Sequence, residues 1–441
     1  MASNETMSLA DKGQRIGLRL IAKAGGLPGL KDKEVRARVE RYLYKGAVTG
    51  FKAQTAAGRA FAKKKASGGP ARPATAKPKQ QFDLTPSEDQ QMIQGVAREL
   101  AEEVIRPAAA GADAERAVPE AVTSAAADMG LHLIGVPAEL DGIAEERSAV
   151  TASLVLEELA RGDMGIATSI MAPAAVATAL ASYGDADQQA TYLAEFAGEN
   201  PPVAALALQE PQVLFDPFAL RTTGAREGDE IVLDGVKAIV PGAEKAELFI
   251  VSAAIDGESR LVLVKAGLEG LKAEDDPAMG VRAAKTARLH LEGVRVSASD
   301  LLGTVEDHAD AVRRSRLAWA AAAVGTSQAV LDHVSEYVKE RKAFGEPIGY
   351  RQTVAFTVAD IAVELASLRL VVWKAASRLD RGEDASAEIA QARSLVSRHA
   401  TWIGSSGVQL LGGHGFVKEF DNERWYRDLR GAGVLEGTLL V

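Results

Sequence analysis

The hydrophobic and polar positions of this 441-residue chain change their period twice. From residue 81 to about residue 200 the period is helical, and Ala, Leu, Glu and Arg fill the runs between Pro and Gly breaks. The segment Leu84–Glu88 opens this part, because Thr85 or Ser87 can cap a helix and the acidic residue favours its first turn. We therefore predict an N-terminal helical domain over residues 81–200. Its predicted helical runs include Gly95–Ile105, Ala121–Met129 and Ala149–Arg161.

Around Pro201 the helical period gives way to short β-rich runs. Three dipeptides of the kind that forms tight turns, Gly228-Asp229, Asp234-Gly235 and Asp256-Gly257, occur among these runs. Hairpins joined in this way predict a compact antiparallel sheet or barrel over residues 201–303. The predicted strands are Val203–Leu208, Glu230–Val240, Leu248–Ala254, Leu261–Lys265 and Ala287–Val296.

After Leu302 the helical period returns, and it predicts a C-terminal helical bundle over residues 304–441. Runs at His308–Lys339 and Ala385–Leu411 supply partners for a helix whose apolar residues repeat at alternating steps of four and three, a spacing typical of a core stripe. The predicted fold class is therefore α+β and mainly α, with a middle β domain between two helical domains. The stripe consists of Val354, Val358, Ile361, Leu365, Leu368 and Val372.

The first 80 residues differ from the rest in charge. They hold 18 Lys and Arg and 5 Asp and Glu, a formal charge of +13, whereas the remaining residues carry −22. Gly and Pro are frequent in this part, so we predict a basic extension and linker over residues 1–80. It is either a solvated tail or a contact for a membrane surface or a partner, and no specific nucleic-acid binding is expected. The expected location is cytoplasmic, with attachment at a membrane as the alternative.

Composition excludes several classes of protein. With 47% hydrophobic and 25% charged residues the chain is of ordinary globular composition, and we interpret its longest uncharged run, Met164–Gly184, as a buried helix. The absence of cysteine excludes disulfides, thiolate metal sites and Fe–S clusters, so any redox chemistry needs a bound cofactor. No dinucleotide or P-loop glycine motif, zinc-hydrolase motif or serine-hydrolase motif occurs, and no metal site is predicted.

Two clusters in the last quarter of the chain could contact a ligand. Arg341–Ile348 and Gln352 place basic groups and Phe344 at a helix end, where they could hold a pyrophosphate and pack on a flat ring, or merely complement the helix dipole. Gln409–Gly415 ends an apolar helix in three glycines, which lets backbone approach a ligand but also ends ordinary helices.

A third cluster, Glu436–Thr438, contains a candidate general base. Glu436 follows the apolar pair Val434 and Leu435, and burial would raise the pKa of its carboxyl group toward neutrality. The adjacent glycine would let a substrate come close. The alternative is a solvated glutamate near the end of the chain.

In their order and spacing these clusters make residues 82–438 similar to the acyl-CoA dehydrogenase family. Three further stretches strengthen the resemblance: Leu208–Pro211 resembles the family's T-E-P loop, Gly280–Thr286 its G-x-R-x-x-x-T stretch, and Tyr426–Asp428 the segment before its catalytic base. The resemblance implies FAD as cofactor, an acyl-CoA thioester as substrate and its oxidation to a trans-2-enoyl-CoA, with electrons passing to an electron-transfer flavoprotein.

The resemblance also assigns roles to residues. It implies that Glu436 removes the α proton while the β hydrogen leaves as hydride to the flavin, and that Arg316 lies close to the CoA portion. The cofactor-binding set reaches FAD partly across a subunit boundary, which implies a homodimer or homotetramer. That set is Arg341, Phe344, Gln352, Gln409, Gly412, Gly413, Thr438 and Gln209.

Two stretches depart from the family pattern. Leu214 and Phe215 stand where relatives have Gly and Ser, and Ile239 and Pro241 stand where relatives have an aromatic residue and a hydroxyl donor near the flavin. Proline lacks even its own N–H. These departures leave open a catalytically silent or scaffold subunit of a mixed oligomer as the alternative function, and a flavin monooxygenase on the same fold as a third.

Overall fold

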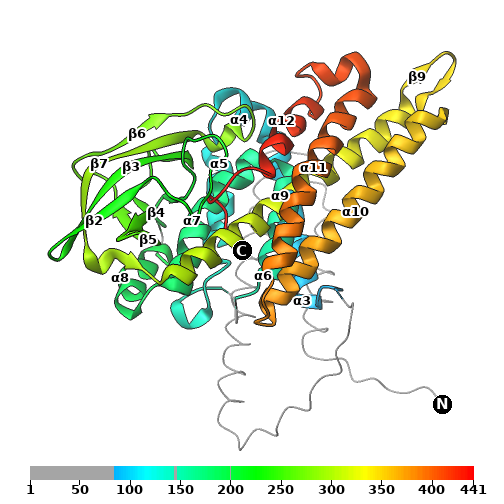
Figure 1. The fold of residues 1–441 in the computed structure, drawn as a ribbon. Coiled ribbons are helices and arrows are strands. Elements are labelled where there is room, and N and C mark those ends of the chain that lie inside the picture. The colour runs from blue at the N-terminus through cyan, green and yellow to red at the C-terminus, as the bar shows by residue number, and fades with distance from the viewer. Residues whose placement is uncertain (1–83, 144–146, 199) are drawn as a thin grey trace, which may run out of the picture. The chain divides into compact units, whose positions relative to one another are not determined.

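The computed structural model describes residues 84–143, 147–198 and 200–441, which belong to one compact unit, Phe82–Val441 (Figure 1). The predicted basic extension, with its membrane or partner contact, lies outside the described residues.

Helices form the first part of this unit, as predicted. The first helix begins at Glu88 because Ser87 caps it: the Ser87 hydroxyl accepts the Gln90 N–H at 3.2 Å, and the Gln90 side chain accepts the Ser87 N–H at 2.9 Å. The helices are α3 (Glu88–Leu100), the π-helical turn η2 (Ala101–Ile105), α4 (Arg106–Glu115), α5 (Glu120–Asp128), α6 (Ala149–Gly162), α7 (Met164–Tyr183) and α8 (Ala186–Phe196), with short 3-10 turns at Leu131–Leu133 and Ala138–Leu140.

Helix α7 is long and apolar enough to cross a membrane, and no other helix of the described ranges is. In its most apolar window, however, 83% of the residues are buried inside the protein. Its side chains pack in the helical core and against β1 (Ala204–Ala207). The interpretation of this run as a buried helix is confirmed.

The middle of the chain forms a mixed, open sheet (Figure 1). Its order is β6-β7-β3-β2-β4-β5-β8, and β1 pairs with β4. Both β1 and β2 run parallel to β4, so the sheet is neither wholly antiparallel nor a closed barrel. Strands that a tight turn joins directly pair antiparallel. A long loop separates β1 from β2, so these two strands are free to pair with β4 in parallel. The strands after β1 are β2 (Thr223–Glu227), β3 (Glu230–Pro241), β4 (Leu248–Ile255), β5 (Glu258–Lys265), β6 (Leu271–Asp275), β7 (Thr286–Ser297) and β8 (Leu301–Leu302).

One of the three predicted turns is wrong. Gly228-Asp229 and Asp256-Gly257 do connect adjacent strands, but Asp234-Gly235 lies inside β3, where the register against β7 shifts. Asp234 pairs with β2 on one side and β7 on the other, so ladder hydrogen bonds override the local turn preference. Gly235 is needed here because a Cβ would stand 2.6 Å from Thr222.

The C-terminal part is a bundle of long helices, as predicted (Figure 1). In α10 the stripe residues Ile361, Leu365, Leu368 and Val372 are buried, and the two earlier ones are half-buried. The elements are α9 (Val305–Glu340), the hairpin of β9 (Lys342–Ala343) and β10 (Glu346–Pro347), α10 (Gln352–Asp380), α11 (Ser386–Leu411) and α12 (Asn422–Ala432).

The segment after α12 connects the bundle to the sheet. It leaves the helical part at Gly433, and the Thr438 N–H then donates to the Leu206 carbonyl in β1 at 3.2 Å. The residues at its centre therefore lie where α9, α11 and the β1 edge converge.

Candidate active site

The Glu436 carboxylate is buried, with only 4% of the residue exposed. Arg316 of α9 holds it with a fork: Nε lies 3.1 and 3.0 Å from the two carboxylate oxygens, and Nη2 lies 2.8 Å from Oε1. Arg393 of α11 places its Nη2 2.7 Å from the same Oε1. A buried carboxylate with two guanidinium partners is a site for charge or proton chemistry, and the alternative of a solvated glutamate is excluded.

The backbone around Glu436 is fixed from the sheet side and from the helix side. The Glu436 N–H donates to Gln209 Oε1 at 3.0 Å, and the Thr438 hydroxyl donates to the Ile239 carbonyl at 3.4 Å. On the other side, the Gly437 carbonyl accepts bonds from the Ser315 hydroxyl and from Trp319 Nε1, each at 2.9 Å. Three predicted site residues besides Glu436 thus come together here, namely Gln209, Arg316 and Thr438.

Gly437 is required at this point of closest approach. Its φ is +73°, and an added Cβ would stand 2.8 Å from Leu208 Cβ. We expect Gly437→Ala to lower the free energy of unfolding by about 2–4 kcal/mol, through backbone strain and overpacking, and to displace Glu436. Denaturant unfolding tests this. Gly228→Ala is the matched control, because its φ is also positive but open space surrounds its Cβ position, so an equal loss there would contradict the packing argument.

Behind Gln209 lies a buried ion pair. Lys237 Nζ is 2.9 Å from Glu210 Oε1 and also donates to Ser252 Oγ and to the Leu208 carbonyl. Burial lowers the pKa of the Lys237 ammonium to about 8, although the Glu210 charge opposes the shift. Burial alone would raise the pKa of Glu210, but Lys237 and two backbone N–H donors outweigh it and lower that pKa. This pair fixes the strand end that carries Gln209.

Six other predicted site residues form an exposed group at the far end of the bundle. The Phe344 ring is 94% exposed in the β9–β10 hairpin, and Arg351 lies over it at 5.2 Å. Tyr337 joins the two halves of the group, because its backbone carbonyl accepts the Arg341 N–H while its hydroxyl contacts His414 Nδ1 at 2.9 Å. The group consists of Arg341, Phe344, Gln352, Gln409, Gly412 and Gly413, which we call the outer cluster.

The outer cluster and Glu436 are well separated within one chain. Arg341 follows Arg316 by 25 residues along the α9 helix, a rise of roughly 37 Å. Figure 1 likewise shows β9 at one tip of the bundle, away from the C-terminal loop. The structure therefore brings the predicted residues together as two groups.

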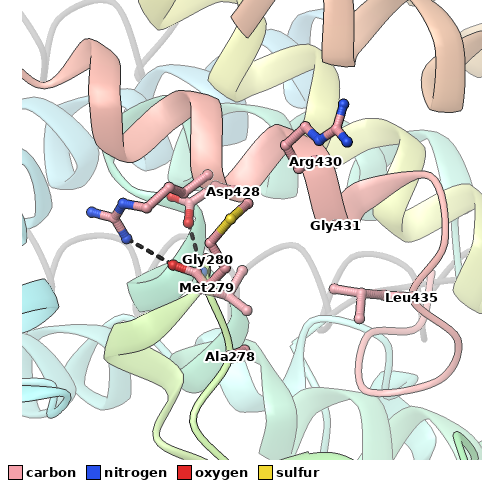
Figure 2. A pocket seen from close by; sticks show the side chains of 9 residues that line it. Ala278, Met279, Gly280, Asp428, Arg430, Gly431 and Leu435 are labelled. Atoms are coloured by element: carbon pink, nitrogen blue, oxygen red, sulfur yellow. Dashed lines mark hydrogen bonds between the residues drawn. The ribbon is translucent and has the colours of Figure 1, made fainter. Parts of the chain in front are cut away.

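A cavity of about 180 Å³ opens beside Leu435, the residue before Glu436 (Figure 2). Its walls are the turn Ala278–Val281 and the C-terminal half of α12, and they are mostly apolar. Asp428 points at this turn and accepts the Val281 N–H at 2.6 Å, whereas Arg430 extends away from it. The predicted motif stretches Gly280–Thr286 and Tyr426–Asp428 thus meet, and they border the loop that carries Glu436.

Asp428 gives the protein a pH dependence that can be measured. Burial, and next the negative charge of Asp163, raise its pKa to about 8. Because the folded state keeps this proton while the unfolded state loses it above about pH 4, Asp428 should lower the unfolding free energy progressively from pH 4 to pH 8.

We expect Asp428→Asn to lose that pH dependence and to be at least as stable as the wild type at pH 8. Urea unfolding of both proteins across this pH range measures the difference. Parallel stability curves for the two proteins would contradict the expectation.

Comparison with known proteins agrees with this geometry. Residues 87–200, 205–294 and 309–440 match the N-terminal, middle and C-terminal domains of acyl-CoA dehydrogenase. The short-chain specific acyl-CoA dehydrogenase of Mus musculus mitochondria is 33% identical over 365 residues, covering 80% of this chain and 87% of the relative. The chain belongs to the acyl-CoA dehydrogenase family. FAD is the cofactor of this family of acyl-CoA oxidoreductases.

Two further relatives bear on the chemistry. Cyclohex-1-ene-1-carbonyl-CoA dehydrogenase of Geobacter metallireducens is 30% identical over 363 residues, covering 80% of this chain and 95% of the relative. A chain of the solved structure of the electron transferring flavoprotein of Acidaminococcus fermentans has a TM-score of 0.74 and 28% identity, covering 81% of this chain and 96% of that one.

The residues present fit FAD in this acyl-CoA dehydrogenase. In the outer cluster, Gly412 and Gly413 have open space where a Cβ would stand, so a phosphate could approach their backbone beside the basic hairpin. Ile239 is held at a φ of +55° in the β3 bulge, a conformation that β-branched residues avoid and that marks functional sites.

Sequence reasoning missed Arg393 and Trp319, both of which contact the Glu436–Gly437 segment. A signal for Arg393 was present: it lies four residues after Ile389 and three before Val396, both buried, so it stands on the apolar face of α11. A charged residue at such a position indicates a buried partner. Trp319 reads as an ordinary core residue, and only its hydrogen bond to Gly437 distinguishes it.

Proposed function

We propose that this chain catalyses the α,β-dehydrogenation of an acyl-CoA thioester to the trans-2-enoyl-CoA. The observation that carries the proposal is the buried Glu436 carboxylate, which two arginines hold in a loop whose preceding residue, Leu435, lines a cavity. Removing the weakly acidic α proton of a thioester requires such a positioned base in a site that excludes water. FAD, when bound, supplies the two-electron acceptance.

The chain's own residues have distinct tasks in this proposal. Glu436 accepts the α proton on its carboxylate. In this structure the Glu436 N–H donates to Gln209 Oε1. Once the Gln209 side chain moves aside, the same N–H can donate to the thioester carbonyl oxygen. The Glu436 residue is itself only 4% exposed, so bulk water has little access to its carboxylate.

The silent or scaffold subunit is the less favoured reading. Desolvating a carboxylate costs free energy, and here two guanidinium groups and a fixed loop compensate for that cost. A scaffold has no need of this arrangement. The replacements at Phe215, Ile239 and Pro241 alter residues expected near the flavin and leave Glu436 in place. A flavin monooxygenase, the third alternative, would have no use for a base at Glu436.

We also propose a homodimer or homotetramer in which the outer cluster of one subunit completes the FAD site of another. The separation within one chain supports this, because it places the outer cluster far from Glu436. The exposed rings of Phe344, Tyr350 and Phe416 favour coverage by a second protein surface. Light scattering of the purified protein tests it, and a monomer that retains FAD would contradict it.

An electron-transfer flavoprotein is the proposed acceptor, in keeping with the family and with the Acidaminococcus chain described above. The decisive experiment mixes the FAD-loaded protein with a panel of acyl-CoA esters of different length and branching without oxygen. Bleaching of the flavin by at least one ester is expected, and its colour should return when an electron-transfer flavoprotein is added. A flavin that no ester bleaches would contradict the dehydrogenase proposal, whereas bleaching without transfer would contradict only the acceptor.

A further inference from the structure

Arg393 contacts the candidate base from a different helix than Arg316 does. Its Nη2 lies 2.7 Å from Glu436 Oε1, and its Nη1 donates to the Leu435 carbonyl at 2.9 Å. The side chain is 17% exposed, so most of it is packed in the protein. One planar guanidinium therefore holds both the carboxylate and the backbone of the residue before it, which fixes where the carboxylate points.

The two oxygens of Glu436 are bonded unequally as a result. Oε1 faces Nε and Nη2 of Arg316 and Nη2 of Arg393. Within the described ranges, Oε2 accepts a hydrogen bond from Nε of Arg316 alone, at 3.0 Å. A carboxylate oxygen that already accepts three charged donors has little capacity for a proton, so Oε2 is the oxygen left to accept one.

Both cations reach Glu436 from helices of the bundle. Among the described residues, the charged side chains that contact Glu436 are Arg316 from α9 and Arg393 from α11, while Gln209, Ser315 and Trp319 contact the same segment as neutral groups. Burial lowers the pKa of the Arg393 guanidinium, with Glu436 opposing the shift, but arginine stays protonated in proteins. Arg393 is therefore a permanent cationic partner of the carboxylate, and its removal would leave the carboxylate held by Arg316 alone.

We infer that Arg393 is a positioning residue for the base: it holds Oε1 of Glu436 and leaves Oε2 to accept the proton. This inference rests on the proposed function and deepens it by naming the second cation that holds the base. Arg393 acts only through Glu436 and Leu435.

The test compares Arg393→Gln with Arg398→Gln, which removes the same charge from an exposed position of the same helix. The first readout is flavin reduction by an acyl-CoA at a single pH. Arg393→Gln should lower kcat by about 10–100-fold with little change in KM, because the carboxylate loses a group that fixes where it points, and Arg398→Gln should keep the wild-type kcat. A wild-type kcat in Arg393→Gln would overturn the inference.

The second readout needs no catalysis. It is a double-mutant cycle of urea unfolding at one pH, which combines Arg393→Gln with Glu436→Gln. The stability loss caused by Arg393→Gln should be smaller in the Glu436→Gln background than in the wild type, because the charge pair is already gone there. Equal losses in both backgrounds would overturn the inference. Because this readout requires no turnover, it decides the role of Arg393 even if no acyl-CoA reduces the flavin.

A second variant covers failure of Arg393→Gln to fold. Arg393→Lys keeps the charge but cannot bind the carboxylate and the Leu435 carbonyl with one planar group. It should unfold at the same urea concentration as the wild type while lowering kcat with little change in KM. An unchanged kcat in Arg393→Lys would overturn the positioning role.

Discussion

Replacement of Glu436 with glutamine is expected to lower the rate of α-proton removal from an acyl-CoA by about 10²–10⁴-fold or more, while the protein folds and retains FAD. The amide keeps the shape of the side chain and can still accept bonds from Arg316 and Arg393, but it cannot take up the proton. Exchange of the α hydrogen with deuterium from solvent, followed by mass spectrometry, measures this step directly.

A matched variant separates this effect from a general loss of charge. Glu419→Gln removes a carboxylate from an exposed position between the glycine turn and α12 and should exchange at the wild-type rate. Circular dichroism and bound flavin must be the same in all three proteins. Wild-type exchange in Glu436→Gln would show that another group is the base, and the proposal for this site would then fail.

The second large effect concerns stability and not chemistry. Lys237→Met leaves Glu210 buried at 3% exposure without its cation, and we expect a loss of about 3–5 kcal/mol in the free energy of unfolding. Adding Glu210→Gln should recover part of that loss, because the charge left without a partner is then removed. Urea unfolding of the single and double variants at pH 7 measures both changes.

The exposed pair Arg226 and Asp256 provides the comparison. Their side chains are 45% and 61% exposed, so Arg226→Met should cost about 1 kcal/mol or less. A loss of the same small size in Lys237→Met would mean that the buried pair does not stabilise the strand end that carries Gln209.

The arrangement of the site suggests how substrate binding is coupled to the fold. Gln209 and Glu436 come from β1's end and from the segment after α12, and their hydrogen bond joins the sheet to the bundle. A thioester that takes over the Glu436 N–H must break this bond. Because Lys237 and Glu210 hold the backbone beside Gln209, the side chain can move while the strand stays in place.

Local patterns in the sequence determined the elements of this protein. The changes of period predicted the helical, β and helical parts and the buried run at 164–184, and capping preference predicted a cap at Thr85 or Ser87, which the structure places at Ser87. These features depend on residues near one another in the chain. The order of three short clusters, together with their family resemblance, predicted Glu436, Arg316 and the outer cluster as candidates.

Only the tertiary structure decided how these elements meet. Strand pairing beyond the turns made the sheet mixed and turned Asp234-Gly235 into a bulge, since ladder partners distant in sequence outweigh a local turn preference. The pairing of Glu436 with Arg393 and Gln209 likewise joins residues 43 and 227 positions apart. The apolar face of α11 can mark Arg393 as having a buried partner, but no local signal names that partner, because the energy of such contacts depends on which groups folding buries together.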